Sequence, residues 1–126
     1  MTTRSAKISF LTDRASNVGA FEPGSYLRLT GIVRYFDTAK RWCQIEDENN
    51  FFVVDLQLCD MAGIDIGKLF QFIGEVSPVL DQVRFQGCGD DVCLHATLAR
   101  CVDGLDLGLY KQAVAARDKY LDDMMR

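Results

Sequence analysis

The side chains with the most chemical potential are five cysteines and a single histidine. Cys88, Cys93 and His95 lie close together in the chain and are of the types that bind zinc. They contain no CxxC pair, however, and there is no second histidine, so the sequence predicts neither a metal site nor a cofactor. An odd cysteine count without a secretory signal favours reduced, mostly buried thiols over disulfides. The five are Cys43, Cys59, Cys88, Cys93 and Cys101.

Nucleophilic catalysis would also have to use His95, beside Cys93 in an alternating segment. A histidine in such a segment is more often structural. The sequence contains no Gly-rich phosphate loop, no GxSxG and no HExxH. The sequence therefore predicts a protein that is not an enzyme.

Aromatic and basic side chains could instead contact a single nucleic-acid strand, with bases stacked on rings and phosphates held by cations. Trp42 is the best stacking candidate, together with either Phe51 or Phe52, since those neighbours face opposite sides of a strand. Tryptophan and phenylalanine also fill barrel cores, so both roles stay open. The basic candidates are Arg34, Lys40, Arg41 and Arg84.

The charge balance argues against strong binding of nucleic acid by this chain alone. Its formal net charge is −4, whereas independent binders usually carry a basic excess. Asp47 and Glu48, expected at a hairpin tip, would repel phosphate. We therefore expect auxiliary contact only. No apolar run approaches the roughly 20 residues of a membrane span, and the first residues, MTTRSAKISF, lack a signal-peptide core, so we expect an intracellular protein with no membrane contact.

The segments that position these side chains are rich in β-branched and aromatic residues, which predicts strands. A short helix or turn is expected over 57–67 and a long loop over 77–91. The pattern predicts an all-β fold, a five-stranded OB-fold barrel with a short helix between strands 3 and 4 and a C-terminal helix. An open α+β sheet is the alternative. The predicted strands are 26–36, 41–47, 51–56, 69–76 and 92–102, with a further short pairing over 7–11.

A length of 126 residues fits one domain, with the barrel over about 7–102 and the helix over about 106–125. Gly31 lies in the middle of the first long strand, where a glycine indicates a bulge or bend. A strand bent there can serve two sheets, as a closed barrel requires. Alternation places Leu27, Leu29, Val33 and Tyr35 on one face and Arg28, Thr30, Ile32 and Arg34 on the other.

The C-terminal helix has an unusually wide apolar surface. Asp103 and Asp106 are both N-cap candidates. At about 100° per residue, the apolar side chains cover roughly half of the circumference, whereas a helix lying on its own barrel needs a stripe of about 100°. The surplus favours a second chain as neighbour, and the alternative is that loop 77–91 covers it. One flank holds Leu107, Tyr110, Val114, Leu121 and Met125, and the adjoining flank holds Leu109, Ala113, Ala116, Tyr120 and Met124, with Arg117 near the middle of the arc.

Three segments resemble a known family. They are PGSYLRLTGIVRYFD (23–37), LFQFIGEV (69–76) and ARCVDGLDLGLYKQAVAARDKYL (99–121). They look like the smallest (TEN) subunit of the CST telomere-capping complex, which is related in architecture to the small OB-fold subunit of replication protein A.

The resemblance implies a non-enzymatic subunit that pairs with the STN-type OB-fold subunit through its barrel side and C-terminal helix. The pair would join the large CST subunit. The assembly would bind single-stranded telomeric DNA in the nucleus, protect chromosome ends and support C-strand fill-in by DNA polymerase α-primase. The alternative is a stand-alone or replication protein A-like single-stranded DNA-binding protein.

Two interface positions carry over from this resemblance: Arg28, in SYLR, and Tyr120, in RDKYL. Where the family can show a basic residue one turn after that tyrosine, this chain has Met124, so an apolar contact is expected there. The predicted partner-binding residues are Arg28, Leu107, Tyr110, Ala113, Val114, Arg117, Tyr120, Leu121 and Met124.

Overall fold

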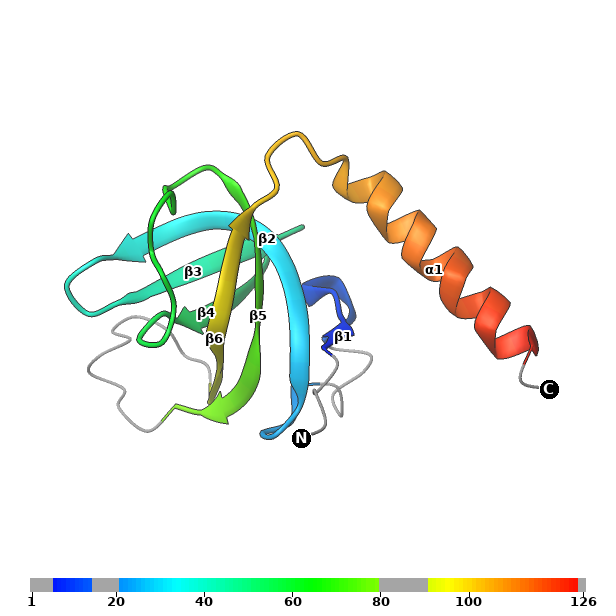
Figure 1. Cartoon of the computed structure of the whole chain (residues 1–126), viewed down its shortest axis with the longest axis horizontal. Helices are drawn as coiled ribbons and strands as arrows, with labels where there is room; N and C mark the ends of the chain where they lie inside the picture. The colour runs from blue at the N-terminus through cyan, green and yellow to red at the C-terminus, as the bar shows by residue number, and fades with distance from the viewer. Residues whose placement is uncertain (1–5, 15–20, 80–90, 125–126) are drawn as a thin grey trace.

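Strand β2 (Tyr26–Asp37) is the longest strand and pairs with two different neighbours. Its first half, Tyr26–Ile32, runs antiparallel to β5 (Leu69–Pro78), and its second half, from Ile32, runs antiparallel to β3 (Trp42–Asp47). The computed structural model describes residues 6–14, 21–79 and 91–124. The curved β2 is visible in Figure 1. The predicted bend of the first long strand is confirmed.

The barrel closes through the remaining strands. β3 pairs with β4 (Asn50–Asp55), β4 runs parallel to β6 (Val92–Cys101), and β6 pairs with β5. Because β5 also pairs with β2, the five strands β2–β6 form a closed ring, which is the predicted OB-fold barrel. A short strand, β1 (Lys7–Ile8), adds in parallel to β2, and a 3₁₀ turn, η1 (Leu11–Asp13), follows it.

Two glycines permit the close backbone approaches that closure requires. A Cβ on Gly31 would lie 3.0 Å from the Cβ of Ile45 and 3.2 Å from the carbonyl oxygen of Glu46, across the β2–β3 contact. A Cβ on Gly74 would lie 2.2 Å from the carbonyl oxygen of His95, where β5 meets β6 at a register shift. Both glycines therefore allow tight strand contacts at points where the sheet bends.

Inward-facing side chains of all five strands fill the barrel. Phe52, Phe70 and Phe72 are the largest fully buried ones, and Phe70 stacks on Phe72 with ring centroids 5.8 Å apart. Buried β-branched and aromatic residues at alternating positions explain why these segments form strands. The alternation fails at one point on β2, where the register shifts between Val33 and Tyr35. Beyond this bulge Tyr35 lies on the outside, which corrects its predicted place on the same face as Leu27, Leu29 and Val33.

The predicted short helix between the third and fourth barrel strands is absent. Residues 57–67 form successive turns instead. Asp60 and Asp65 accept backbone N–H hydrogen bonds from Ala62 and Ile66, and aspartate contacts of this kind compete with helix formation. Gly63 and Gly67 adopt positive φ, which also ends helical geometry. The segment still contributes Cys59 and Ile64 to the core.

Helix α1 (Leu107–Met124) begins as predicted at an aspartate cap. Asp106 Oδ1 accepts the N–H of Leu109 at 3.0 Å, so Asp106 is the N-cap. Asp103 instead accepts the N–H of Leu69 at 2.7 Å and fixes the preceding turn to β5. The helix then runs away from the barrel, so that its far end stands clear of the strands (Figure 1).

Replacing Gly74 with alanine tests the close approach of β5 and β6. The new Cβ would clash with backbone that cannot move without breaking the strand pairing, so we expect a loss of about 3 kcal/mol in the free energy of unfolding. Urea denaturation followed by circular dichroism measures it. Gly108→Ala is the matched control, because its Cβ would meet nothing closer than 3.5 Å and stability should not fall. A Gly74→Ala protein as stable as the parent would contradict the close approach.

Candidate partner interface and nucleic-acid face

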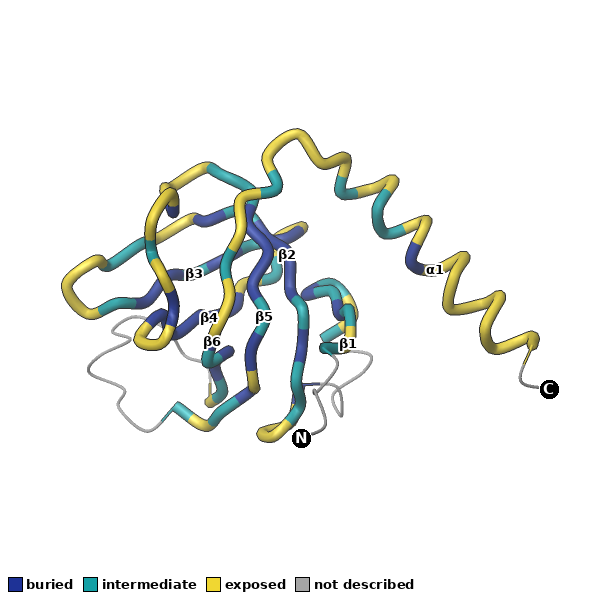
Figure 2. Tube along the Cα trace, viewed as in Figure 1, coloured by how far each residue is buried: buried dark blue, intermediate teal, exposed yellow. Residues whose placement is uncertain are grey.

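Helix α1 touches the barrel only through its first half. Leu107, Tyr110 and Lys111 are half-buried, and Val114 is the one buried helix residue. Figure 2 shows the change along the helix, from covered positions near its start to exposed positions at its end. Burial of a single valine is worth about 2 kcal/mol. Three of the predicted partner-binding residues, Leu107, Tyr110 and Val114, lie on the side of the helix that faces their own barrel, and of these only Val114 is buried.

The adjoining flank of α1 carries large apolar side chains that no described residue covers. Leu109, Tyr120 and Met124 are 63%, 64% and 65% exposed, and Ala113 and Ala116 lie between them. At about 100° per residue these five side chains share a sector of roughly 80°. We call them the apolar flank. Its members are Leu109, Ala113, Ala116, Tyr120 and Met124, and the exposed Leu121 and Arg117 border it on the barrel side.

A row of side chains on the outside of the barrel lies beside this helix. Strand register places Ile8 opposite Arg28, Arg28 opposite Ile73, and Ile73 opposite Leu98. Directly paired residues point to the same face of a sheet. Leu98 is 53% exposed, and the other three are half-buried. These four residues, Ile8, Arg28, Ile73 and Leu98, form the barrel row.

A cleft of about 500 Å³ separates the barrel row from the far half of α1. Arg28 and Ile73 line it on the barrel side, and Arg117 and Asp118 line it on the helix side. Arg117 donates to Asp118 at 3.1 Å. The Arg28 Nε is buried and has no hydrogen-bond partner within the described ranges. The structure therefore brings the predicted residues Arg28 and Arg117 together, although they come from opposite ends of the chain.

The outer face of β3 and β4, where OB folds commonly bind strands, is partly closed by an apolar cluster. Trp42 is only 3% exposed and packs with Val53, Cys93 and Val79. The Tyr35 ring covers it from the side, at a centroid distance of 4.9 Å. Trp42 is therefore not available for base stacking, which corrects its predicted role.

The exposed rings on this face are Tyr35 and Phe51, which are 48% and 43% exposed. The sequence predicts that either Phe51 or Phe52 can stack on a base. Phe52 lies in the core, so Phe51 is the one that is exposed. Tyr35 was missed because a one-residue bulge turns it outward.

The predicted basic residues differ in their availability. Arg34 pairs with Glu46 at 2.9 Å. Arg41 donates to the carbonyl oxygens of Leu56 and Cys59, so its guanidinium supports the loop after β4. Lys40 lies exposed in the β2–β3 turn. Arg84 lies outside the described residues. The face therefore combines limited positive charge with the acidic side chains of its hairpin.

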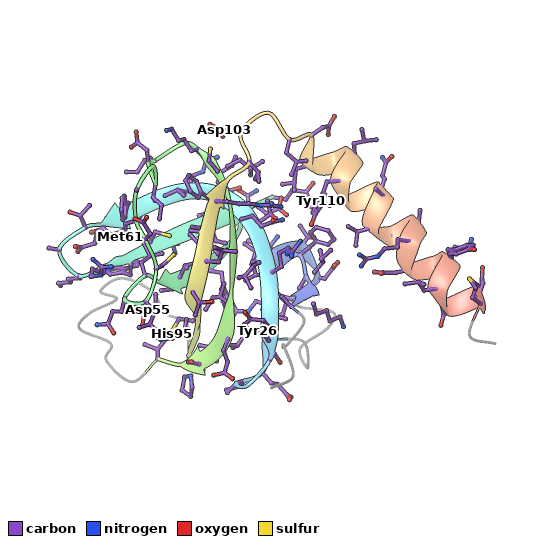
Figure 3. All side chains as sticks on the ribbon, in the orientation of Figure 1. Tyr26, Asp55, Met61, His95, Asp103 and Tyr110 are labelled. Atoms are coloured by element: carbon purple, nitrogen blue, oxygen red, sulfur yellow. The ribbon has the colours of Figure 1, made fainter. Side chains whose placement is uncertain are left out.

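Three of the cysteines and the histidine occupy structural positions, whereas Cys101 is exposed. Cys43, Cys59 and Cys93 are buried, and burial raises the pKa of the Cys43 and Cys59 thiols, which keeps them protonated. His95 Nδ1 lies 3.1 Å from Asp55 Oδ2, and the two side chains lie next to each other in Figure 3. Within residues 6–14, 21–79 and 91–124, no three ligating side chains form a metal-binding group. Cys88 lies outside those ranges.

Taken together, the barrel topology and the projecting helix define a small OB-fold protein whose C-terminal helix leaves an apolar flank exposed. None of the described helices is long and apolar enough to cross a membrane.

The fold is similar to that of Ten1 from S. pombe, alone (TM-score 0.67, 20% identity, covering 91% of this chain and 99% of that one) and in the Stn1–Ten1 complex (TM-score 0.67, 19% identity, covering 94% and 96%).

Sequence comparison defines the family. A CST complex subunit TEN1 from Arabidopsis thaliana is 24% identical over 103 residues, which span 82% of this chain and 76% of the relative. Residues 2–124 match the family described as "Telomere-capping, CST complex subunit", and the chain belongs to this family. Its members are non-enzymatic OB-fold subunits, which confirms the predictions of family, fold and absence of enzymatic activity.

The pKa of the Glu46 carboxyl reports the electrostatics of the outer face of β3 and β4. It is held below its usual value by the Asn49 backbone N–H and by Arg34. The ion pair between Glu46 and Arg34 is therefore present at neutral pH and is lost as the pH falls through this lowered pKa. Arg34→Gln should raise the pKa of Glu46 only part of the way to normal, because Asn49 still donates. A carboxyl-carbon NMR titration measures it, and an unchanged value would mean that Arg34 does not hold Glu46.

Proposed function

We propose that this chain forms a heterodimer with an STN-type OB-fold subunit through the apolar flank and the barrel row. The observation that carries the proposal is the unpartnered flank of α1, whose three large side chains are each more than 60% exposed. Exposed apolar surface of this extent marks interaction sites in proteins of this size. Support also comes from the S. pombe relative, which was solved in a complex with Stn1.

The geometry of the two surfaces suits a helical segment of the partner. An amphipathic helix could lie along the flank with its apolar face on Leu109, Tyr120 and Met124. Its neighbouring barrel could then approach the barrel row, where Leu98 is exposed and Arg28 is half-buried. Arg117 and Leu121 would line the junction between the two surfaces.

Within the complex, the pair is proposed to join the large CST subunit and to act on single-stranded telomeric DNA in the nucleus. End protection and C-strand fill-in by polymerase α-primase would be activities of the assembly. Family membership supports this placement. The net charge of −4 supports a subunit that relies on its partners for most of the phosphate contacts.

Tyr120→Ala tests the heterodimer. We expect the affinity for the STN-type subunit to fall about 30-fold, or about 2 kcal/mol, because the ring is a central aromatic anchor of the flank. Isothermal titration calorimetry with the purified partner measures it. Gln112→Ala, on the polar side of the same helix, is the matched control and should leave the affinity unchanged. Normal binding by both Tyr120→Ala and Arg28→Glu would refute this interface.

A second candidate function is weak contact with single-stranded DNA by the isolated chain. The exposed Tyr35 and Phe51 rings, together with Lys40, favour it. We expect binding to an oligothymidine at low salt that weakens as salt rises. Tyr35→Ala should reduce it about tenfold, in line with the loss of one stacked base. Fluorescence anisotropy measures it, Tyr120→Ala is the matched tyrosine control, and no detectable binding at low salt would eliminate this function.

A further inference from the structure

Two consecutive residues of α1 reach two different parts of the barrel. Tyr110 lies on the side of the helix that faces the strands, as Figure 3 shows, and its hydroxyl accepts a hydrogen bond from Gln71 on β5 at 3.4 Å. Lys111 extends to the β3–β4 hairpin, where its ammonium lies 2.7 Å from Asp47. The helix is thus attached at two separate points within one turn.

The Lys111–Asp47 pair is well shielded from water. The side chain of Asp47 is 4% exposed and that of Lys111 is 21% exposed. Lys111 also lies 3.7 Å from Glu48 and 5.7 Å from the centroid of the Phe10 ring, within cation–π range. The contact is an ion pair, because the buried Asp47 Oδ2 has no hydrogen-bond partner among the described residues and Lys111 supplies the charge that compensates it. A buried carboxylate tolerates the loss of such a partner poorly.

The hairpin that holds Asp47 is itself rigid. Glu48 and Asn49 both have positive φ, as a type I′ turn requires. The Asn50 side chain donates to the carbonyl oxygens of Asp47 and Glu48, and Glu46 accepts the N–H of Asn49. Asp47 is therefore a fixed point on the barrel.

The Tyr110 attachment is equally well anchored. Gln71 is 3% exposed, and its amide also donates to Thr30 at 3.2 Å. Its carbonyl oxygen accepts two hydrogen bonds from Arg100, at 2.7 and 3.1 Å. Phe10 packs edge-on against the Tyr110 ring at 5.8 Å. Tyr110 is thus held by β5 and the N-terminal segment, and Gln71 on β5 is in turn held by β2 and β6.

We propose that the Lys111–Asp47 ion pair, aided by the Tyr110–Gln71 hydrogen bond, is a latch that fixes the direction of α1 and so preorganises the apolar flank for its partner. Val114 is the one helix side chain that is buried, and an apolar contact of that size permits the helix to pivot. About 15 Å of helix extends past Val114, so a small rotation at the latch displaces Tyr120 and Met124 by several ångströms. The role in partner binding rests on the proposed heterodimer, whereas the latch itself does not.

Spin labels measure the direction of the helix in the isolated full chain. Labels at Lys40→Cys and Asp123→Cys, with Cys88 and Cys101 replaced by serine, report the distance between the barrel and the helix end by double electron–electron resonance. The parent should give a narrow distance distribution. Lys111→Met, which keeps the aliphatic stem, should broaden it, and Lys119→Met on the exposed side of the same helix should not. A narrow distribution in Lys111→Met would refute the latch.

A double variant separates the latch from simple destabilisation. Asp47→Asn combined with Lys111→Met removes both charges and leaves no uncompensated buried carboxylate. Its unfolding midpoint should return toward that of the parent, while its distance distribution stays broad. Recovery of a narrow distribution would show that the ion pair does not set the helix direction, and would overturn the proposal.

Partner affinity then tests the role of the latch in binding. If the competent orientation falls to about a tenth of the population, the dissociation constant for the STN-type subunit should rise about tenfold in Lys111→Met and in the double variant. An unchanged constant beside a broadened distribution would refute preorganisation. Failure of the proposed heterodimer itself gives a different result, because Tyr120→Ala would then have no effect on binding while the spin-label distances still report the latch.

Discussion

The double pairing of β2 is the constraint on which the rest of the structure depends. One strand must hydrogen-bond to β5 along its first half and to β3 along its second half, and it can do so only if it bends. The missing side chain of Gly31 lets β3 approach at the bend, and Gly74 does the same for β6 on the opposite side of β5. Once these contacts form, the five strands close and the phenylalanine core is sealed inside.

Closure also decides what lies on the surface. The register that pairs β1, β2, β5 and β6 brings Ile8, Arg28, Ile73 and Leu98 into one row, although they are distant in the chain. The same closure carries the β3–β4 hairpin to the place where α1 begins, so that Asp47 can meet Lys111. The proposed interaction surface is therefore a consequence of barrel topology, with the helix added to one edge of it.

Sequence patterns predicted the features that depend on local order. The bend of β2 at Gly31 and the aspartate cap of α1 are set by neighbouring residues and are confirmed, and strand alternation holds on β2 up to the bulge after Val33. The missed features depend on long-range contacts. Trp42 is buried because β6 supplies Cys93 and the chain after β5 supplies Val79, and Tyr35 turns outward because a single bulged residue reverses the alternation. The sequence alone shows how wide the apolar arc on α1 is. Which side of the helix faces the barrel depends on two long-range contacts, of Tyr110 with Gln71 and of Lys111 with Asp47.

The two sides of α1 hold different kinds of contact, and the difference has a physical reason. On the barrel side, Tyr110 accepts a hydrogen bond from Gln71 and Lys111 forms an ion pair with Asp47, and these contacts bury little apolar area. On the other side, Leu109, Tyr120 and Met124 offer apolar area that remains exposed in the isolated chain. If α1 were held mainly by apolar burial, those side chains would already be buried against its own barrel. Docking through polar contacts leaves them for another chain, whose binding then gains the full hydrophobic contribution.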